Sequence, residues 1–290
     1  MCKQSFLAVE QPLDLGVTLG SGQSFRWRLN DDGAWTGVLG HDMVRLRAVE
    51  GGLLVESGPT PPGKLTDALA AYLRLDDDLS AIQRQLAEDG RLREAIASYP
   101  GLRVLRQDPW ETLAAFILSQ NSNIPRIAGT IEAIAQRFGD PVEQVGASRH
   151  TFPSPGRLAE AGEKALRDLG CGYRAPYLSG AAAMVASGEV RLDRLRRASY
   201  QEAQEALLAI LGVGEKVADC VMLFALDQMD AFPVDRWIRR ALEEWYAPGI
   251  AMTYPRARAW ALEQFGPLAG YANQYLFWGR RQGKSATLSP

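Results

Sequence analysis

The chain has 290 residues, of which 47% are hydrophobic and 23% charged, so it can bury a large core and has the composition of a globular protein. Its net charge of −2 argues against a protein held to DNA by bulk charge alone. It has no apolar run of membrane-spanning length and no signal-peptide core at the N-terminus, so we expect a cytoplasmic protein with no membrane partner.

Cysteine and histidine are too sparse for the common metal sites. The three cysteines, Cys2, Cys171 and Cys220, are widely separated and form no CxxC pair. A disulfide scaffold, a structural zinc site and an iron–sulfur cluster are therefore not expected. The only histidines, His41 and His150, lie far apart, which leaves little basis for a histidine-based mechanism. We expect that no cofactor is required.

The N-terminal segment, to about residue 57, has the pattern of an antiparallel sheet. Short runs at 24–28, 35–39 and 43–47 alternate apolar and polar residues. Turn signals at 30–33 and 51–52 separate such runs. The alternation predicts strands with one face on a core and the other in water.

After the Pro/Gly-rich stretch at 58–63 the pattern becomes helical, beginning with apolar residues at helical spacing between 65 and 73 and continuing to about residue 282. We therefore expect an α+β protein with an N-terminal antiparallel β-sheet domain followed by a two-part all-helical region. The expected parts are 1–104 for the sheet domain with flanking helices, 105–150 plus 212–290 for one helical domain, and 151–211 for a second helical subdomain.

A polar cluster at 119–126 follows an apolar helix predicted over 113–118. Its Ser, Asn and Gln side chains are typical of helix caps and turns, which is one interpretation. The alternative is that these amides face a nucleic-acid duplex and bond to an exposed base edge.

Two predicted helices flank the three residues Gly212-Val213-Gly214. The first helix begins at Ser199, where Glu202 gives the spacing of a capping box. A loop with two glycines can bring its backbone N–H groups close to a phosphate, so this helix–hairpin–helix predicts a contact with nucleic acid. A tight interhelical turn without such a role is the alternative.

Lys216 stands in the first turn of the second helix, where the helix dipole disfavours a cation. An amine that loses its proton readily is a candidate nucleophile. On a helix, Asp219 and Cys220 would be its neighbours at i+3 and i+4. An ordinary surface lysine is the alternative interpretation.

Asp235 lies nineteen residues after Lys216 and follows Pro233 and Val234. Its position before a helical pattern predicts a helix cap, and helix N–H donors would keep the carboxylate ionised. Such a carboxylate is able to stabilise a developing cation, although capping alone is the simpler interpretation.

The segment 231–290 is basic, with eight Arg or Lys against four Asp or Glu. It forms either a phosphate-binding face or an ordinary solvated face. The basic residues are Arg236, Arg239, Arg240, Arg256, Arg258, Arg280, Arg281 and Lys284.

Two segments with aromatic residues, at 22–27 and around Phe277, allow either a structural or a ligand-binding interpretation. Residues 22–27 combine a flexible glycine with Phe25, Arg26 and Trp27, which also suits an ordinary strand at a sheet edge. Phe277 follows two tyrosines at helical spacing and is either core or a stacking wall for an extruded base.

Taken together, these motifs resemble the helix–hairpin–helix DNA glycosylases, and among them the 8-oxoguanine DNA glycosylase/AP lyases of the eukaryotic type. The order of the matching segments agrees with that family and spans nearly the whole chain. The segments are Ser21-Gly22-Gln23-Ser24-Phe25-Arg26-Trp27, Leu105-Arg106-Gln107-Asp108-Pro109, Asn121-Ser122-Asn123-Ile124, Gly172-Tyr173-Arg174-Ala175, the hairpin from Gly212 to Cys220, and Val234-Asp235.

The resemblance implies catalytic roles for Lys216 and Asp235. Lys216 would attack C1′ of the damaged nucleoside, expel the base and leave a Schiff base that permits β-elimination. Asp235 would support this attack electrostatically. The carbonyl of Gly22 would read the N7 proton of oxidised guanine, and Phe277 would stack on the flipped base with Cys220 near its opposite face.

The resemblance also implies the DNA contacts. Asn121, Arg126, Tyr173 and Arg174 would fill the gap left by the base and contact the opposite cytosine. The hairpin would bind DNA through Gly212, Gly214 and Val217. The same resemblance implies a monovalent cation at the backbone carbonyls of Leu208, Ile210 and Val213.

Three positions depart from the family pattern. Trp237 stands where the animal enzymes have a histidine, and Ser122 is the middle residue of the asparagine run. The glutamine that reads the Watson–Crick edge of the base is replaced by the shorter Asn273, with Gln274 beside it. The chain also ends without a basic tail, which suits a prokaryotic version.

We therefore expect an enzyme of base-excision repair that flips 8-oxoguanine out of duplex DNA, cleaves its glycosidic bond through a lysine Schiff base and nicks the strand. Its partner would be duplex DNA with the lesion opposite cytosine, and it would act as a monomer. The alternatives are a glycosylase of the same fold for alkylated purines and a non-catalytic DNA-binding module. A binding module needs neither Lys216 nor Asp235.

Overall fold

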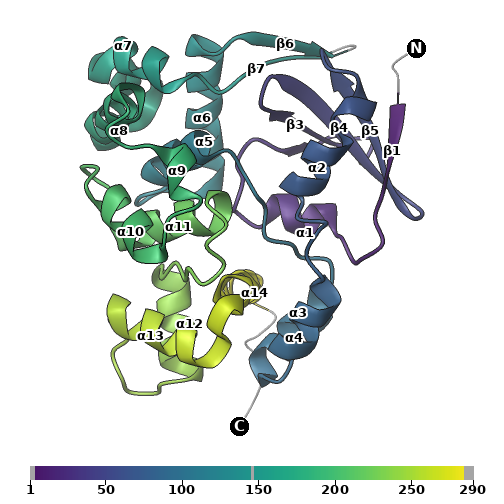
Figure 1. The fold of residues 1–290 in the computed structure, drawn as a ribbon, viewed down its shortest axis with the longest axis vertical. Coiled ribbons are helices and arrows are strands. Elements are labelled where there is room, and N and C mark those ends of the chain that lie inside the picture. Colours follow the sequence, from purple (N-terminus) through teal and green to yellow (C-terminus); the bar gives the residue numbers. More distant parts are fainter. Residues whose placement is uncertain (1–3, 145–146, 284–290) are drawn as a thin grey trace.

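The computed structural model describes residues 4–144 and 147–283, and a β-sheet packs at one side of a largely helical molecule (Figure 1). Cys2 and Lys284 lie outside the described residues. The expected α+β class is confirmed, because an N-terminal antiparallel sheet is followed by helices. The helical region also contains a two-stranded antiparallel sheet of residues 141–144 and 147–150, which the expectation of an all-helical region did not include.

The main sheet is antiparallel, with strand order β1-β5-β4-β3-β2. Predicted strands at 35–39 and 43–47 lie within β3 and β4, which pair directly. One face packs on α1 (Leu15–Gly20) and α2 (Thr66–Tyr72), with Leu46 and Val55 among the fully buried core residues. The strands are β1 (Gln4–Ala8), β2 (Arg28–Leu29), β3 (Trp35–Leu39), β4 (Asp42–Val49) and β5 (Gly52–Gly58).

The strand predicted at 24–28 is wrong, since only Arg28 belongs to a strand. The residues before it form an irregular loop whose backbone bonds to side chains far along the chain, one just before α5 and one in β7. Gln107 Nε2 donates to the Gln23 carbonyl at 2.7 Å, and Arg149 Nη1 donates to the Arg26 carbonyl at 2.8 Å. These bonds satisfy backbone groups that a sheet ladder would otherwise satisfy.

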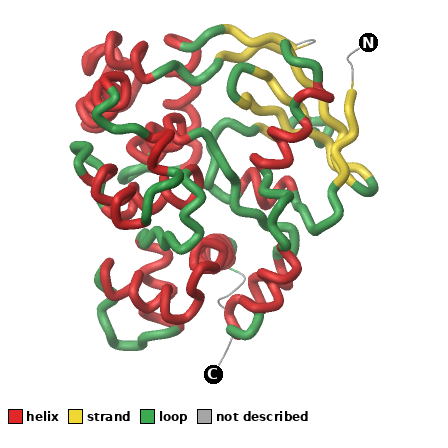
Figure 2. The backbone as a smooth tube through the Cα atoms, viewed as in Figure 1, coloured by secondary structure: helices red, strands yellow, loops and turns green. Residues whose placement is uncertain are grey.

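The helices lie beside the sheet (Figure 2). Their buried side chains form one continuous hydrophobic core. Helices α3 and α4 contribute to this core, and α4 packs against α14. Because α3 and α4 pack with helices that follow residue 104, the core does not mark a domain boundary there, and the expected boundary stays a prediction. The remaining elements are α3 (Leu79–Leu86), α4 (Gly90–Ser98), α5 (Pro109–Leu118), α6 (Ile124–Phe138), β6 (Pro141–Gln144), β7 (Ala147–His150), α7 (Pro155–Leu166), α8 (Ala175–Ser187), α9 (Leu192–Leu195), α10 (Tyr200–Leu208), α11 (Glu215–Ala225), α12 (Arg236–Trp245), α13 (Tyr254–Phe265) and α14 (Ala269–Arg281).

Local signals place the helices that matter for the candidate site. The capping box predicted at Ser199 and Glu202 is present at the start of α10. The polar cluster at 119–126 joins α5 to α6, and Asn123 caps α6 by accepting the Arg126 N–H at 3.0 Å. None of the helices in the described part of the chain has both the length and the apolar character needed to cross a membrane.

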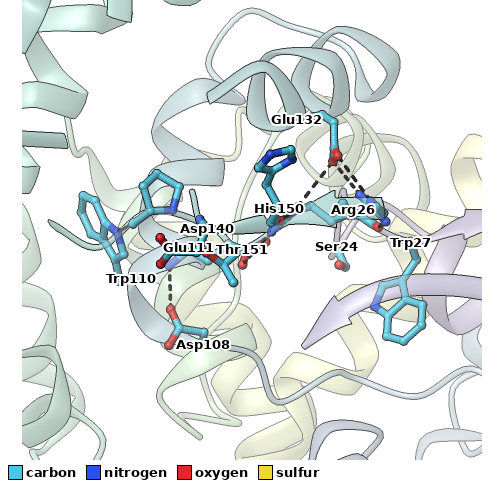
Figure 3. Close-up of polar contacts among 12 residues, drawn as sticks. Ser24, Arg26, Trp27, Asp108, Trp110, Glu111, Glu132, Asp140, His150 and Thr151 are labelled. Atoms are coloured by element: carbon cyan, nitrogen blue, oxygen red, sulfur yellow. Dashed lines mark hydrogen bonds and ion pairs between the residues drawn. The ribbon is translucent and has the colours of Figure 1, made fainter. Parts of the chain in front are cut away.

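A buried ion-pair network ties the loop after α1 to α6 and β7. Glu132 of α6 accepts from Arg149 Nη2 at 2.5 Å and lies 3.6 Å from Arg26 Nε (Figure 3). Arg26 Nη2 also donates to the His150 carbonyl. Burial opposes the ionised form of Glu132, but the bond and charge of Arg149 hold its pKa below the usual value.

We expect Glu132→Gln to lower the free energy of unfolding by about 3–5 kcal/mol, because Arg149 would keep a buried charge without its carboxylate partner and Arg26 would keep only Glu111. Since the pKa of Glu132 is lowered in the folded protein, this contribution is complete at neutral pH and is lost as the pH falls through that lowered value. Urea denaturation at pH 7 measures it.

A matched control is Glu163→Gln, which breaks the exposed i,i+4 pair between Glu163 and Arg167. It should change the free energy of unfolding by no more than about 0.5 kcal/mol. Equal denaturation midpoints for the two variants would contradict a stabilising role for the network.

Candidate active site

A cavity of about 970 Å³ opens where the sheet loop meets the helices. Its wall combines aromatic rings with one lysine, one aspartate and several amides. This composition suits a flat aromatic ligand that carries polar edges. The lining residues include Gly22, Phe25, Phe116, Ser119, Asn121, Arg126, Lys216, Cys220, Phe224, Asp235, Trp237, Asn273, Gln274, Phe277 and Arg281.

The hairpin places Lys216 at this cavity. Gly214 is the N-cap of α11, so Lys216 lies in the first helical turn, as predicted. Its half-buried side chain reaches Ser119 Oγ, to which Nζ donates at 3.2 Å. Nζ also lies 4.9 Å from the ring centroid of Phe116. An aromatic face and a hydroxyl therefore hold the amine at the cavity wall.

Gly212 is required by the hairpin geometry. Its φ of +85° is strained for other residues, and a Cβ atom would lie 2.3 Å from the Tyr177 ring. Its carbonyl accepts Gln120 Nε2 at 3.0 Å, which joins the hairpin to the turn after α5. Leu211 and Gly214 are exposed, so the outer edge of the hairpin is open to a ligand.

Val217 differs from the exposed part of the hairpin, because its side chain is 3% exposed and belongs to the core. It lies in the first turn of α11, where backbone N–H groups have no partner within the helix. A DNA contact at Val217 would therefore use its N–H group, not its side chain.

Asp235 caps α12, as predicted, and lines the same cavity as Lys216. Its Oδ1 accepts the N–H groups of Trp237 and Ile238, both at 2.8 Å. The carboxylate is half-buried. The helix terminus thus holds a negative charge at a fixed point of the wall.

Cys220 is buried beside both charged groups. Burial raises the pKa of its thiol to about 12, with the Lys216 charge acting in the opposite direction and the charges of Asp219 and Asp235 adding to the rise. The thiol is therefore neutral at physiological pH. Asp219 is not a polar neighbour of Lys216, because its carboxylate is fully buried and bonds to Tyr200 and Tyr254.

Gly22 and Phe277 lie close together in the cavity wall. A Cβ atom on Gly22 would be 3.7 Å from the Phe277 ring and 3.0 Å from Ile124 Cδ1. The φ of Gly22 is +81°, a further reason for glycine here. Gln23 anchors the loop, since its buried amide donates to the Thr18 carbonyl at 2.9 Å and accepts the Leu105 N–H at 2.8 Å.

Asn273 and Gln274 are both buried in the wall formed by α14. Asn273 Nδ2 donates to the Pro233 carbonyl at 3.0 Å, and Gln274 Nε2 donates to Ser21 Oγ at 2.8 Å. Each amide nitrogen is thus held by the protein. Asn273 also fixes the segment that leads into Asp235.

The residues assigned to the opposite strand gather at the α5–α6 turn. Asn121 has a φ of +47°, and its Nδ2 donates to Tyr173 Oη at 3.2 Å. The buried Arg174 donates to the Gln120 and Asn121 carbonyls at 2.7 and 3.1 Å, and its guanidinium lies 4.4 Å from the Tyr173 ring. Arg126 is exposed at the cavity mouth.

Sequence reasoning did not single out Ser119, Gln120 or Phe116. Ser119 and Gln120 lie in the predicted polar cluster, but only the folded chain brings them to the hairpin 92 or more residues away. Phe116 lies in an apolar run that gives no signal of a ligand. Within residues 4–144 and 147–283, no three or more His, Cys, Asp or Glu side chains are grouped to hold a metal ion.

Two protein-family models match successive parts of the chain. Residues 5–113 match the N-terminal domain of 8-oxoguanine DNA glycosylase, and residues 114–260 match the HhH-GPD superfamily of base-excision DNA repair proteins. The N-glycosylase/DNA lyase OGG1 of Arabidopsis thaliana is 33% identical over 279 residues, which cover 91% of this chain and 76% of that protein.

Two solved structures are similar over almost the full length. The structure of MBOgg1 with a low-affinity DNA ligand has a TM-score of 0.93 and 37% identity, covering 98% of this chain and 97% of that one. The 8-oxoguanine glycosylase/lyase of Clostridium acetobutylicum, bound to duplex DNA with cytosine opposite 8-oxoguanine, has a TM-score of 0.89 and 30% identity, covering 98% and 100%. The chain therefore belongs to the 8-oxoguanine DNA glycosylase family of N-glycosylase/DNA lyases, within the HhH-GPD superfamily.

Proposed function

We propose that this protein removes 8-oxoguanine from duplex DNA and then cleaves the strand at the resulting site. The observation that carries the proposal is the meeting of Lys216 and Asp235 in one aromatic-walled cavity beside the hairpin. An amine nucleophile and a carboxylate suffice for this chemistry, so no metal or cofactor takes part in a step.

Lys216 Nζ, in its neutral form, would attack C1′ of the flipped nucleotide. The bond from C1′ to the base nitrogen breaks, and the base leaves with the bonding electrons and takes up a proton. Loss of the ring oxygen from C1′ then gives a Schiff base between C1′ and Nζ. Removal of a C2′ proton expels the 3′ phosphate by β-elimination, and hydrolysis frees the lysine.

Asp235 would stabilise the positive charge that develops on the sugar during this attack. Its Oδ1 is held by two N–H groups of α12, so the carboxylate needs little reorganisation when the charge appears. Ser119 would orient the amine through the bond to Nζ.

The base would lie between Phe277 and the Cys220 side of the cavity. Stacking on an aromatic ring contributes about 1–3 kcal/mol per base and offsets part of the cost of flipping. A neutral thiol suits the opposite face, because it adds no charge next to the aromatic base. The Gly22 carbonyl would accept the N7 proton, which oxidised guanine has and guanine lacks.

The remaining contacts would be to DNA outside the cavity. Asn121 and Tyr173 would occupy the gap left by the flipped base, while Arg126 and Arg174 would contact the opposite cytosine. Gly212, Gly214 and Val217 would contribute backbone N–H groups to a phosphate. The proposal includes a monomeric enzyme, because a glycosylase of this kind engages one base at a time.

We expect Lys216→Gln to abolish covalent trapping by borohydride on a duplex with 8-oxoguanine opposite cytosine. Base release should fall by about two orders of magnitude, equivalent to about 2.7 kcal/mol of activation free energy. Trapping is measured by gel shift and base release by chromatography in single-turnover reactions.

Lys164→Gln is a suitable control, because Lys164 is a highly exposed lysine whose Nζ pairs with Asp168 at 3.0 Å, away from the cavity. It should trap DNA like the native chain. Trapping that survives Lys216→Gln would assign the nucleophile elsewhere. Undiminished base release by Lys216→Gln, with strand cleavage alone lost, would favour a monofunctional glycosylase. The alternative enzyme of the same fold, which acts on alkylated purines, is of that kind.

We expect Arg126→Ala to reduce the preference for cytosine opposite the lesion by about tenfold, as loss of a base-edge contact costs about 1–3 kcal/mol. The measurement is the ratio of single-turnover rates with cytosine, adenine, guanine and thymine opposite 8-oxoguanine. Arg137→Ala, at the exposed far end of α6, is the matched control. An unchanged ratio in Arg126→Ala would remove Arg126 from opposite-base recognition.

The proposal also includes a monovalent cation at the carbonyls of Leu208, Ile210 and Val213. The Ile210 carbonyl accepts the Val213 N–H at 3.0 Å, which brings these residues into one tight turn. A carbonyl oxygen has two lone pairs and is able to bind a cation in addition. The cation would add positive charge at the hairpin, where a phosphate is expected.

Replacing potassium by tetramethylammonium at constant ionic strength should weaken binding to duplex DNA by about fivefold, or about 1 kcal/mol, because the bulky ion cannot enter the turn. Fluorescence anisotropy with a labelled duplex measures the dissociation constant, with sodium as an intermediate case. The same dissociation constant in all three salts would rule out this site.

A further inference from the structure

A buried carboxylate connects the helix of Lys216 with the segment that carries Asp235. Asp219 lies one turn after Lys216 on α11 and is fully buried. Its Oδ1 accepts the Tyr200 hydroxyl at 2.5 Å, and its Oδ2 accepts the Tyr254 hydroxyl at 2.6 Å. Asp219 thereby joins α11 to α10 and α13 behind the cavity.

The same carboxylate also holds the chain just before Asp235. Asp219 accepts a bond from the backbone N–H of Phe232, three residues before Asp235. The next residue, Pro233, is held from the other side, since its carbonyl accepts Asn273 Nδ2 at 3.0 Å. Two buried side chains therefore fix consecutive residues of the segment that leads to Asp235.

A carboxyl group, with two acceptor oxygens, suits this position because each oxygen accepts one tyrosine hydroxyl. Burial raises the pKa of Asp219 above its usual value, and the bonds from Tyr200 and Tyr254 offset only part of that rise. Arg258, whose guanidinium lies 3.5 Å from the Tyr200 ring, adds a nearby positive charge. An amide of the same shape has one acceptor oxygen, so it could not accept both tyrosine hydroxyls as Asp219 does.

We propose that Asp219 is a positioning residue that sets the location of Asp235 relative to Lys216. The assignment rests on the proposed function of the cavity. Asp219 does not line the cavity and so does not touch the substrate. Its effect would be geometric, and a displacement of about 1 Å between reacting groups costs up to about a hundredfold in rate.

Asp219→Asn should therefore reduce the chemical steps more than DNA binding. We expect single-turnover base release and borohydride trapping to fall by about 10- to 100-fold. The dissociation constant for a duplex containing a tetrahydrofuran abasic analogue should stay within about twofold of the native value, because the hairpin and Arg126 are unchanged. All rates are taken with enzyme in excess and below the onset of thermal unfolding.

Two tyrosine variants separate positioning from stability. Tyr254→Phe removes one donor to Asp219 and should lower the base-release rate by a smaller factor. Tyr246→Phe removes a similar bond, from Tyr246 to Asp89 at 2.9 Å, from a residue that does not line the cavity. It should lower the melting temperature and leave the rate at the native value.

Several outcomes would overturn the role of Asp219. These are a native rate in Asp219→Asn, a loss of DNA affinity as large as the loss of rate, or equal rates for Tyr254→Phe and Tyr246→Phe. If Asp219→Asn does not fold, the two tyrosine variants decide. If the native chain neither releases the base nor becomes trapped on the DNA, the proposed function and this role are rejected together. If the native chain is active and Asp219→Asn is equally active, this role alone is rejected.

Discussion

The two helices that begin at one cavity form the constraint on which the site depends. Helix α11 begins directly after its N-cap Gly214 and has Lys216 in its first turn, and α12 begins directly after its N-cap Asp235. A helix N-terminus favours a negative charge and disfavours a positive one. The dipole of α11 thus disfavours the charge of Lys216, whereas the dipole of α12 favours the charge of Asp235. The segment between the two helix starts sets the distance between these side chains.

Structural elements that depend only on neighbouring residues could be predicted from the sequence. The alternating strands at 35–39 and 43–47, the capping box at Ser199, the hairpin and the cap at Asp235 are all confirmed, because each depends on neighbouring residues. The strand expected at 24–28 failed for the opposite reason. In this loop the carbonyls of Gln23 and Arg26 accept bonds from the side chains of Gln107 and Arg149. The residues around the loop carry no signal of such distant partners.

The candidate site was predictable to the same extent. Motif residues such as Lys216 and Phe277 were identified from the sequence, and the fold brings them to one wall. Ser119 and Asp219 gave no comparable signal. Their importance comes from bonds to residues 19 to 97 positions away, and a serine or a helical aspartate has many commoner uses. The roles of the site residues in DNA remain predictions.

The turn at Asn121 has a consequence for the energetics of recognition. Its left-handed backbone is already held by the Arg174 guanidinium, which bonds to two successive carbonyls. Ordering one free residue costs about 1–2 kcal/mol of conformational entropy. Because folding has met that cost in advance, a duplex bound as proposed would encounter a rigid wedge, and its binding energy would remain for the distortion of the DNA itself.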